Sequence, residues 1–357
     1  MCCVHPSAFT RRVASALIPL CSPQDALRPT AIALGSFDGL HPGHRRVIAA
    51  VTDPTDPGSA LQDPPGTELL PADLVPTVVS FWPHPREVLH GEPRLRLDLP
   101  AEKLSLLEPL GIRQLVLVPF DQQLAALSPE AFLDQVLVGQ LQARRIAVGT
   151  NFRFGAGRAG DTDDLRRLGA ARGVAVAVVP MLWDGDERVS SSRIRRALAA
   201  GQLAEAERLL QRPYRFSGGV VRGRQLGRQL GWPTANLRVD GRKFLPLEGV
   251  YAAWAWLPGG EPMAAVMNLG PQPSVDPAAT SAVEVHLLDR RLELAEGQEL
   301  VVQPLELLRR QQRFADLQAL SQQIGRDAER ARRLCAGIGV GQSPADEQTD
   351  ASQQQNA

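Results

Sequence analysis

The sequence predicts an α/β part built on a doubly wound parallel sheet, followed by a small antiparallel β-barrel with a closing helix. At 357 residues the chain is long enough for two domains. From residue 31 to about residue 180, short apolar runs alternate with helical patterns, which indicates a parallel sheet covered by helices on both faces. After Pro213 the β-like runs follow one another without intervening helices, which is typical of an antiparallel barrel or sandwich.

The expected strands of the α/β part are short runs of apolar and β-branched residues. They cover residues 31–34, 75–81, 115–119, 145–149 and 174–179. Helical patterns cover residues 45–50, 101–110, 129–141 and 161–172. Residues 52–76 interrupt this order with Asp-Pro, Pro-Gly and Pro-Pro steps. We therefore expect a long surface loop there, for which a tolerated insertion is a simpler explanation than a lid.

A helical linker, the barrel and a closing helix follow. The linker pattern covers residues 191–211, and the later β-like runs cover residues 218–222, 250–257, 264–268, 283–288 and 300–304. Residues 314–334 form an amphipathic pattern, and the polar, Gln-rich end is typical of disorder. The expected limits are an N-terminal extension at 1–30, the α/β domain at 31–195, the helical linker at 196–212, the barrel domain at 213–336 and a disordered tail at 337–357.

Composition argues against nucleic-acid and membrane partners. The 39 basic and 39 acidic residues give a formal net charge of zero, so no overall field favours nucleic acid. No run approaches the roughly 18 apolar residues of a membrane helix, and the apolar stretch after Arg12 is too short for an export signal. The adjacent Cys2 and Cys3 suit neither a zinc knuckle nor a disulfide framework. A reducing cytoplasm is the simplest location, and a homo-oligomer is compatible with the sequence.

The most informative segment is residues 35–44, Gly-Ser-Phe-Asp-Gly-Leu-His-Pro-Gly-His. It lies between an expected strand and an expected helix, where α/β folds bind phosphates. His41 and His44 can donate hydrogen bonds to a phosphoryl oxygen whose charge grows in a transition state. Gly43 lets backbone and nucleotide approach closely. The alternative is a turn that carries two surface histidines.

Three later phrases of the α/β part suggest ligand contacts. Residues 80–85, Ser-Phe-Trp-Pro-His-Pro, form a stiff loop in which His84 either walls a pocket or is only a turn residue. Residues 149–155, Gly-Thr-Asn-Phe-Arg-Phe-Gly, alternate aromatic rings with an arginine, which suits stacking on a planar ring and contact with a phosphate. Residues 189–195 place consecutive serines at a helix N-terminus, an arrangement that binds anions and also satisfies an N-cap.

Residues 155–160, Gly-Ala-Gly-Arg-Ala-Gly, match the dinucleotide-binding pattern, but we reject that interpretation. The phrase comes late in the sheet and several residues past the end of a strand. No acidic strand terminus follows about twenty residues further on. A glycine-rich loop beside the ligand fits better.

Residues 222–237 form the second passage that is rich in motifs. Glycines every four residues with interleaved arginines suit a loop around phosphates, yet no GxxxxGK[ST] phrase is present. Thr234 and Asn236 offer uncharged oxygens of the kind that nucleotide-bound Mg²⁺ prefers.

Together these phrases resemble the bacterial bifunctional riboflavin kinase/FAD synthetases, whose first domain is an HxGH nucleotidyltransferase. The family phrase G-x-F-D-G-x-H-x-G-H is complete at residues 35–44. T-F-x-P-H-P, V-G-x-x-F-R-F-G and S-S-T-x-I-R are matched at 80–85, 148–155 and 190–195, with Ser80 and Ser192 in place of threonine. In the barrel part, G-R-x-L-G-x-P-T-A-N is matched at 227–236 and E-V-H-x-L-D at 284–289.

The resemblance implies two consecutive reactions, both assisted by Mg²⁺. The barrel domain would convert riboflavin and ATP to FMN and ADP, with Glu284 as the general base. The HxGH domain would then join FMN to the AMP part of a second ATP, giving FAD and pyrophosphate, with His41 and His44 stabilising the α-phosphate.

The resemblance also assigns the binding residues. Nucleotide and phosphate contacts fall to Gly35, Phe37, Asp38, Gly43, Ser191, Ser192, Arg195, Gly227 and Gly231. Flavin contacts fall to His84, Asn151, Phe152 and Arg153, and Mg²⁺ contacts to Thr234 and Asn236.

Departures from the family pattern cluster in the barrel part and leave alternatives open. Gln272 and Ser274 stand in a phrase that usually reads N-x-G-x-x-P-T, and Ala295-Glu296 replaces a usual aromatic. The barrel could therefore be a degenerate flavin-binding module beside a working adenylyltransferase. The HxGH domain could also serve another phosphate substrate, such as a pantetheine or nicotinamide phosphate, although residues 151–155 and the attached barrel disfavour this.

Overall fold

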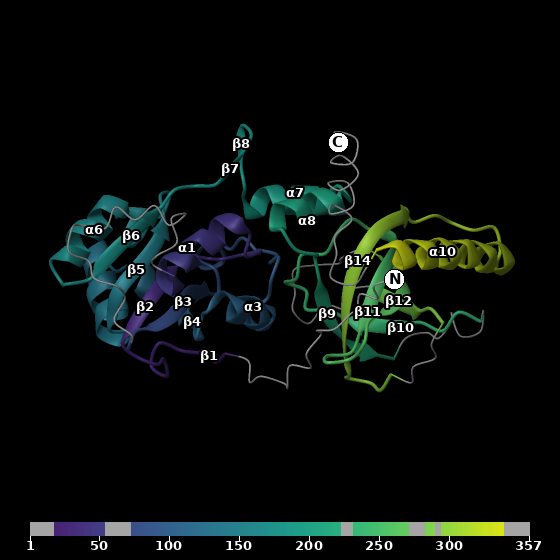
Figure 1. Ribbon diagram of the computed structural model, residues 1–357, viewed down its shortest axis with the longest axis horizontal. Coiled ribbons are helices and arrows are strands. Elements are labelled where there is room, and N and C mark those ends of the chain that lie inside the picture. The colour runs from purple at the N-terminus through teal and green to yellow at the C-terminus, as the bar shows by residue number, and fades with distance from the viewer. Residues whose placement is uncertain (1–17, 54–72, 223–230, 271–282, 290–293, 339–357) are drawn as a thin grey trace, which may run out of the picture.

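The computed structural model describes residues 18–53, 73–222, 231–270, 283–289 and 294–338. Its two halves lie side by side, and a pair of helices crosses the junction between them (Figure 1). The expected loop at 52–76 and the expected disordered tail at 337–357 lie almost wholly outside the described residues. Within the described residues, no helix is both long and apolar enough to cross a membrane.

The first half is a six-stranded sheet in which every pair of neighbours is parallel. Its order is β1-β4-β3-β2-β5-β6, and the five strands expected from the sequence are confirmed as β2 to β6. The bounds are β1 Leu20–Cys21, β2 Thr30–Leu34, β3 Val75–Trp82, β4 Gln114–Pro119, β5 Ala143–Gly149 and β6 Ala175–Val179. The edge strand β1 was not predicted, because its two residues are too few to carry a pattern.

Helices cover both faces of this sheet, which confirms the doubly wound prediction. Successive residues of β2 point to opposite faces, so Ala31 packs in one core cluster and Ile32 in another. Helices α1 (Pro42–Thr52) and α3 (Pro100–Leu107) contribute to the first cluster, and η2 (Leu133–Gln140) and α6 (Thr162–Ala170) to the second. Shorter helices are α2 (Pro85–His90), η1 (Glu108–Leu110), α4 (Gln122–Ala125), α5 (Pro129–Phe132) and η3 (Ala156–Arg158).

The connections of β2 place the turn at residues 35–41 at a special point of the sheet. From β2 the chain proceeds to β3 on one side, while β5 lies on the other side. The carboxyl end of β2 is therefore a topological switch point, where open α/β sheets bind ligands. Helix α1 begins at Pro42, three residues earlier than expected, because proline suits the first position of a helix.

The second half is a closed barrel of antiparallel strands in the order β10-β13-β12-β11-β14-β9. The bounds are β9 Phe216–Val221, β10 Ala235–Arg238, β11 Gly249–Trp256, β12 Met263–Leu269, β13 Val283–Leu287 and β14 Glu299–Arg309. Alternate residues such as Val283 and Val285 fill the interior. Helix α10 (Leu317–Gly337) packs Ala328 and Ala331 against the outer face, as the closing helix was expected to do.

The expected helical linker is two helices, α7 (Ser191–Ala199) and α8 (Leu203–Leu210), separated at Gly201 with φ of 74°. Both helices pack into the same core cluster as the barrel interior. A two-stranded hairpin that the sequence did not predict, β7 (Trp183–Asp184) and β8 (Glu187–Arg188), lies between β6 and α7. The two cysteines among the described residues, Cys21 and Cys335, form no disulfide.

A buried lysine joins the two halves. Lys243 follows β10 and is fully buried. Its ammonium group lies 2.7 Å from the Glu102 carboxylate of α3 and donates to the carbonyl of Leu97 at 2.6 Å. The neighbouring Arg212 pairs with the buried Asp98 at 2.7 Å. Residues 96–98 therefore hold the barrel to the sheet.

Replacing Lys243 by methionine is expected to lower the free energy of unfolding by about 3 kcal/mol, because the partner of a buried ion pair is then left without its counter-charge. Urea unfolding followed by near-ultraviolet circular dichroism measures this. The matched control is Arg222→Met, which removes a cation whose side chain is 86% exposed and lies 3.4 Å from Glu296. The control should leave stability unchanged, and an equally small effect of Lys243→Met would contradict the junction described here.

Candidate active sites

The turn between β2 and α1 is strained and held from several sides. Phe37, Gly39 and Leu40 have φ values of 46°, 92° and 43°. Residues other than glycine rarely adopt positive φ values. Burial of the Phe37 and Leu40 side chains fixes this conformation. The turn is therefore rigid where it enters α1.

Asp38 is the anchor of this turn. One of its carboxylate oxygens accepts hydrogen bonds from the backbone N–H groups of Leu97, at 2.8 Å, and Asp98, at 3.4 Å. The other oxygen accepts from the Arg195 guanidinium, and the backbone carbonyl accepts from the Ser191 hydroxyl at 2.7 Å. The structure thus brings together Asp38, Ser191 and Arg195 from segments far apart in sequence.

His41 and His44 lie against each other at the start of α1. Their rings stack with centroids 3.7 Å apart and an interplanar angle of 20°. A Cβ at Gly43 would lie 3.2 Å from the His41 ring, so only glycine leaves this ring its place without displacement. Neither Nδ1 atom has a hydrogen-bond partner among the described residues. Each is a buried polar atom, and folded proteins rarely leave such atoms without a partner.

Both imidazoles are neutral at pH 7. Burial, reinforced by the charges of Arg45 and Arg188, lowers the pKa of His41 to about 4. Burial also holds the pKa of His44 well below 6.5, with His41 and Lys103 adding to the effect. A neutral imidazole still offers one N–H donor to an anionic ligand.

The start of α7 separates its capping group from its other hydroxyls. Ser190 is the N-cap, since its hydroxyl accepts from the backbone N–H of Arg193 at 3.3 Å. Ser191 donates to Asp38 instead, and Ser192 is exposed. The N-cap role therefore falls to Ser190 alone, and the exposed Ser192 hydroxyl takes no part in capping.

His84 caps α2 beside a group of arginines that the sequence analysis did not single out. Its Nδ1 accepts from the backbone N–H of Arg86 at 3.1 Å, so the turn interpretation of this residue describes its local geometry. Burial, with the charges of Arg96, Arg94, Arg86 and Arg195, lowers the pKa of His84 to about 3. The arginines between residues 86 and 96 were a visible charge signal, but only the packing shows that they gather here.

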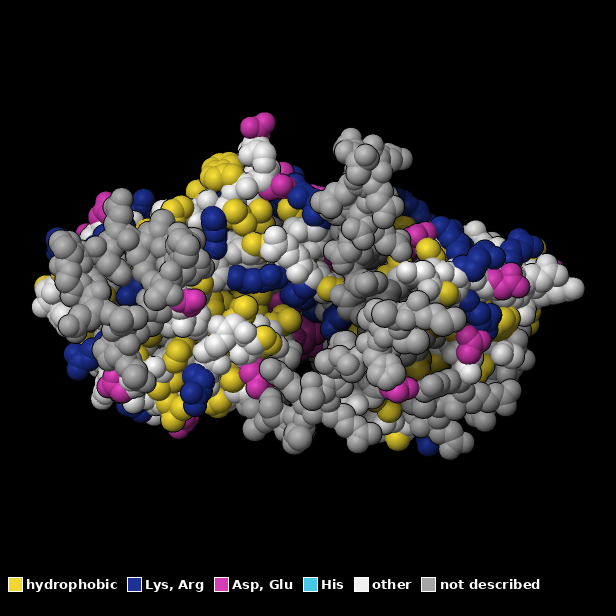
Figure 2. Space-filling model, viewed as in Figure 1, with side chains coloured by type: hydrophobic (Ala, Val, Ile, Leu, Met, Phe, Trp, Pro, Cys, Tyr) yellow, Lys and Arg dark blue, Asp and Glu magenta, His cyan; other side chains and the backbone are white. Residues whose placement is uncertain are grey.

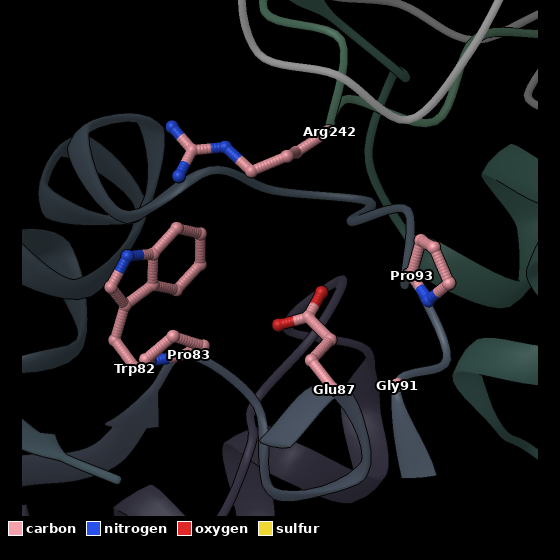
Figure 3. Close-up of a pocket in the computed structure, with 6 residues that line it drawn as sticks. All are labelled: Trp82, Pro83, Glu87, Gly91, Pro93 and Arg242. Carbon is pink, nitrogen blue, oxygen red and sulfur yellow. The ribbon is translucent and has the colours of Figure 1, made fainter. Parts of the chain in front are cut away.

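A pocket of about 270 Å³ opens next to this loop and is lined from both halves. Figure 3 shows the Arg242 side chain reaching from the barrel half over Trp82, with the Glu87 carboxylate pointing into the space between. The guanidinium carbon of Arg242 lies 4.8 Å from the centroid of the Trp82 ring. On the face shown in Figure 2, basic side chains gather along the hollow between the halves.

Asn151, Phe152 and Arg153 follow β5 and so lie at the same sheet edge as the turn after β2. Asn151 and Arg153 are exposed, and Arg153 pairs with Asp161 at 3.1 Å. The Phe152 ring stacks on Phe154 with centroids 5.7 Å apart. The glycine phrase at 155–160 contains the short helix η3 and is not a turn that leads directly from a strand into a helix. This agrees with our rejection of a dinucleotide-binding site there.

The second site is a row of polar side chains on the outer face of the barrel. Glu284 of β13 is the direct cross-strand partner of Asn236 on β10 and of Asn268 on β12. Direct partners project to the same face with Cβ atoms about 5 Å apart. Gln311 donates to the Asn268 side chain at 2.6 Å. The barrel core lies on the opposite face of these strands, so this row is not part of the core.

His286 fixes the segment before Asn236. Its Nδ1 lies 2.7 Å from the carbonyl of Pro233, and because a carbonyl only accepts, Nδ1 carries the hydrogen. The Trp232 ring meets the imidazole edge-on at 5.4 Å. The hydrogen bond to Pro233 fixes the backbone directly before Thr234. Gly231 has φ of 84°, while Gly227, Gln272 and Ser274 lie outside the described residues.

Comparisons with known proteins cover both halves. The family profile described as FAD synthetase matches residues 23–193, and the profile described as riboflavin kinase matches residues 210–335. The chain is 37% identical over 304 residues to the bifunctional riboflavin kinase/FMN adenylyltransferase of Escherichia coli (strain K12), covering 85% of this chain and 92% of that protein. It is 36% identical over 310 residues to the protein of the same name from Pseudomonas fluorescens, with 87% and 94% covered.

A solved structure extends the comparison to three dimensions. A protein from Streptococcus pneumoniae, described as a macrolide-efflux protein, has a TM-score of 0.72 and 26% identity to this chain. It covers 89% of this chain and 99% of its own length. The two profiles define the class, an FAD synthetase domain joined to a riboflavin kinase domain. The chain belongs to the bifunctional riboflavin kinase/FMN adenylyltransferase family.

The buried histidines predict a pH dependence of stability. An unfolded histidine has a pKa near 6.5, whereas folded His41 has one of about 4. Below pH 6.5 the unfolded chain binds a proton that the folded chain does not, so this contribution to stability falls as the pH drops from 6.5 to 4. In His41→Asn, the loss of unfolding free energy between pH 7.5 and pH 5 should be smaller than in the parent by about 2 kcal/mol.

Urea unfolding at the two pH values measures this difference. The control is His90→Asn, which changes a histidine that is exposed at the end of α2. The control should lose as much stability on acidification as the parent. Equal losses in the parent and in His41→Asn would contradict the neutral, buried state of His41.

Proposed function

We propose that this chain makes FAD from riboflavin in two steps at two separate sites. The barrel phosphorylates riboflavin with ATP to give FMN and ADP. The α/β half then transfers the AMP part of a second ATP to FMN and releases pyrophosphate. One observation carries the proposal: a chain of this family has both the stacked histidine pair after β2 and, on the barrel, Glu284 between Asn236 and Asn268.

At the first site, a phosphate oxygen of FMN attacks the α-phosphorus of ATP, and the bond to pyrophosphate breaks. No protein nucleophile takes part, so rate enhancement comes from positioning and from charge stabilisation. His41 and His44 donate N–H groups to the α-phosphate. The backbone at Gly35, Phe37 and Gly43 shapes the nucleotide site.

The departing pyrophosphate is held at the start of α7. Ser191, Ser192 and the helix N-terminus contact its oxygens, together with the guanidinium of Arg195. A carboxylate repels phosphate, so Asp38 acts here through Arg195, which it orients. The flavin lies along His84, Asn151, Phe152 and Arg153, between the sheet edge and the arginine group around His84.

At the second site, Glu284 accepts the proton from the 5′-hydroxyl of riboflavin as that oxygen attacks the γ-phosphorus of ATP. Gly231 lines the nucleotide, and His286 keeps the segment before Thr234 in place.

Mg²⁺ fits this second site as a partner of the nucleotide. Among the described residues no cluster of three or more His, Cys, Asp or Glu side chains could hold a metal by itself. Thr234 and Asn236 instead offer two uncharged oxygens, which suit a Mg²⁺ ion that is bound mainly by phosphates. When bound, the ion neutralises charge on those phosphates.

Domain limits and location complete the proposal. We assign adenylyl transfer to residues 31–195 and phosphorylation to residues 213–336, with 196–212 as the linker. The enzyme works in the cytoplasm on small-molecule substrates, without nucleic acid or membrane as partner. A homo-oligomer is compatible with this assignment.

Two variants separate the sites. His41→Ala combined with His44→Ala should lower FAD formation from FMN at least about 1,000-fold, since both donors to the α-phosphate are lost. FMN formation from riboflavin should stay within about twofold of the parent. Glu284→Gln should do the reverse and lower FMN formation by about 1,000-fold through loss of the base. Chromatography of the flavin products measures both activities in both variants.

The controls are His90→Ala and Glu299→Gln, which change an exposed histidine and an exposed strand glutamate. Both should retain both activities. Loss of both activities in one folded site variant would contradict the assignment of two sites.

A further inference from the structure

The β7–β8 hairpin projects from the molecule between β6 and α7 (Figure 1). Its turn contains Gly185 with φ of 61°. Trp183 is 57% exposed, which is unusual for the largest apolar side chain and has no explanation in packing. The hairpin leads directly into the serines at the start of α7, and so it lies next to the first site.

One face of the hairpin is fastened to the linker helices. Asp184 and Glu187 are direct partners and therefore share a face. Asp184 lies 2.7 Å from both Arg193 of α7 and Arg208 of α8. Glu187 also pairs with Arg193, at 3.6 Å. These ion pairs fix which way the hairpin faces.

The other face carries Trp183 and Arg188, which are also direct partners. The charge of Arg188 acts on His41 and contributes to its lowered pKa. At the base of the hairpin, the Cβ of Leu182 lies 3.7 Å from the position that a Cβ would take at Gly43. As direct cross-strand partners, Trp183 and Arg188 project to the same face, which is the face whose cation acts on His41.

We propose that Trp183 stacks on the adenine ring of ATP at the first site, while Arg188 contacts its phosphates. This inference rests on the proposed adenylyl transfer. ATP is favoured over FMN as the occupant, because the hairpin continues into the start of α7, where the pyrophosphate is placed. The residues assigned to the flavin lie instead after β3 and β5. Binding of ATP would cover an aromatic ring that is otherwise in water.

The kinetic test compares Trp183→Ala with Trp183→Phe. Stacking of a base on an aromatic ring corresponds to roughly a tenfold effect or more, so Trp183→Ala should raise the KM for ATP in FAD synthesis about tenfold. The KM for FMN and the constants of riboflavin phosphorylation should stay within about twofold. Trp183→Phe should retain most of the parent's affinity for ATP. The control Leu317→Ala changes an apolar side chain that is 64% exposed at the start of α10, and it should have no effect.

A contact test does not depend on turnover. Irradiation of the full chain with 8-azido-ATP should label the tryptic peptide 173–188, which contains Trp183, and unlabelled ATP should compete. Labelling elsewhere but not in this peptide, with an unchanged KM for ATP in Trp183→Ala, would overturn the proposal. A raised KM for FMN alone would assign the ring to the flavin instead. A change in oligomeric state of Trp183→Ala, without any effect on ATP, would make the hairpin a protein contact.

The two tests also separate this inference from the function on which it rests. If peptide 173–188 is labelled but the parent makes no FAD from FMN, then the adenine contact stands and adenylyl transfer to FMN fails. If FAD is made and the peptide is not labelled, then the function stands and the adenine contact fails.

Discussion

The carboxylate of Asp38 is the point on which the first site and the domain junction both depend. It holds the strained turn after β2 to the backbone of residues 97 and 98, and it holds Arg195 of α7 from the other side. The carbonyl of Leu97, in the same segment, accepts from the buried Lys243 of the barrel half. A single chain of polar contacts therefore runs from the histidine turn to the barrel.

The two sites differ in how the fold supports them. The first is built on a rigid turn at a switch point of the sheet, and its donors come from distant segments that only tertiary packing assembles. The second projects from the outer face of a closed barrel, away from the apolar interior. Substitutions such as Glu296, exposed on that half, can therefore accumulate without disturbing the core. This explains how departures from the family pattern can coexist with an intact barrel.

Sequence reasoning reached most of the architecture, because the strands β2 to β6 are short apolar runs between helical patterns and the barrel strands follow one another without intervening helices. It missed β10, since Ala235–Arg238 belongs to a phrase that was interpreted as a phosphate loop. It missed the β7–β8 hairpin, whose turn is short and polar. It grouped Asp38 with the phosphate ligands, whereas the carboxylate is engaged by Arg195 and the backbone. The arginines around His84 could not be placed without packing, because no spacing rule brings residues 86, 94, 96 and 195 together.

The most direct test of the central claim, that one chain carries both steps, is product analysis of the purified protein. One reaction contains riboflavin, ATP and Mg²⁺, and a parallel reaction contains FMN in place of riboflavin. The account predicts FAD in both, with FMN preceding FAD in the first. FAD from FMN alone would contradict phosphorylation by the barrel. No FAD in either reaction, with oxidised or reduced flavin, would contradict the assignment of the histidine site to FMN.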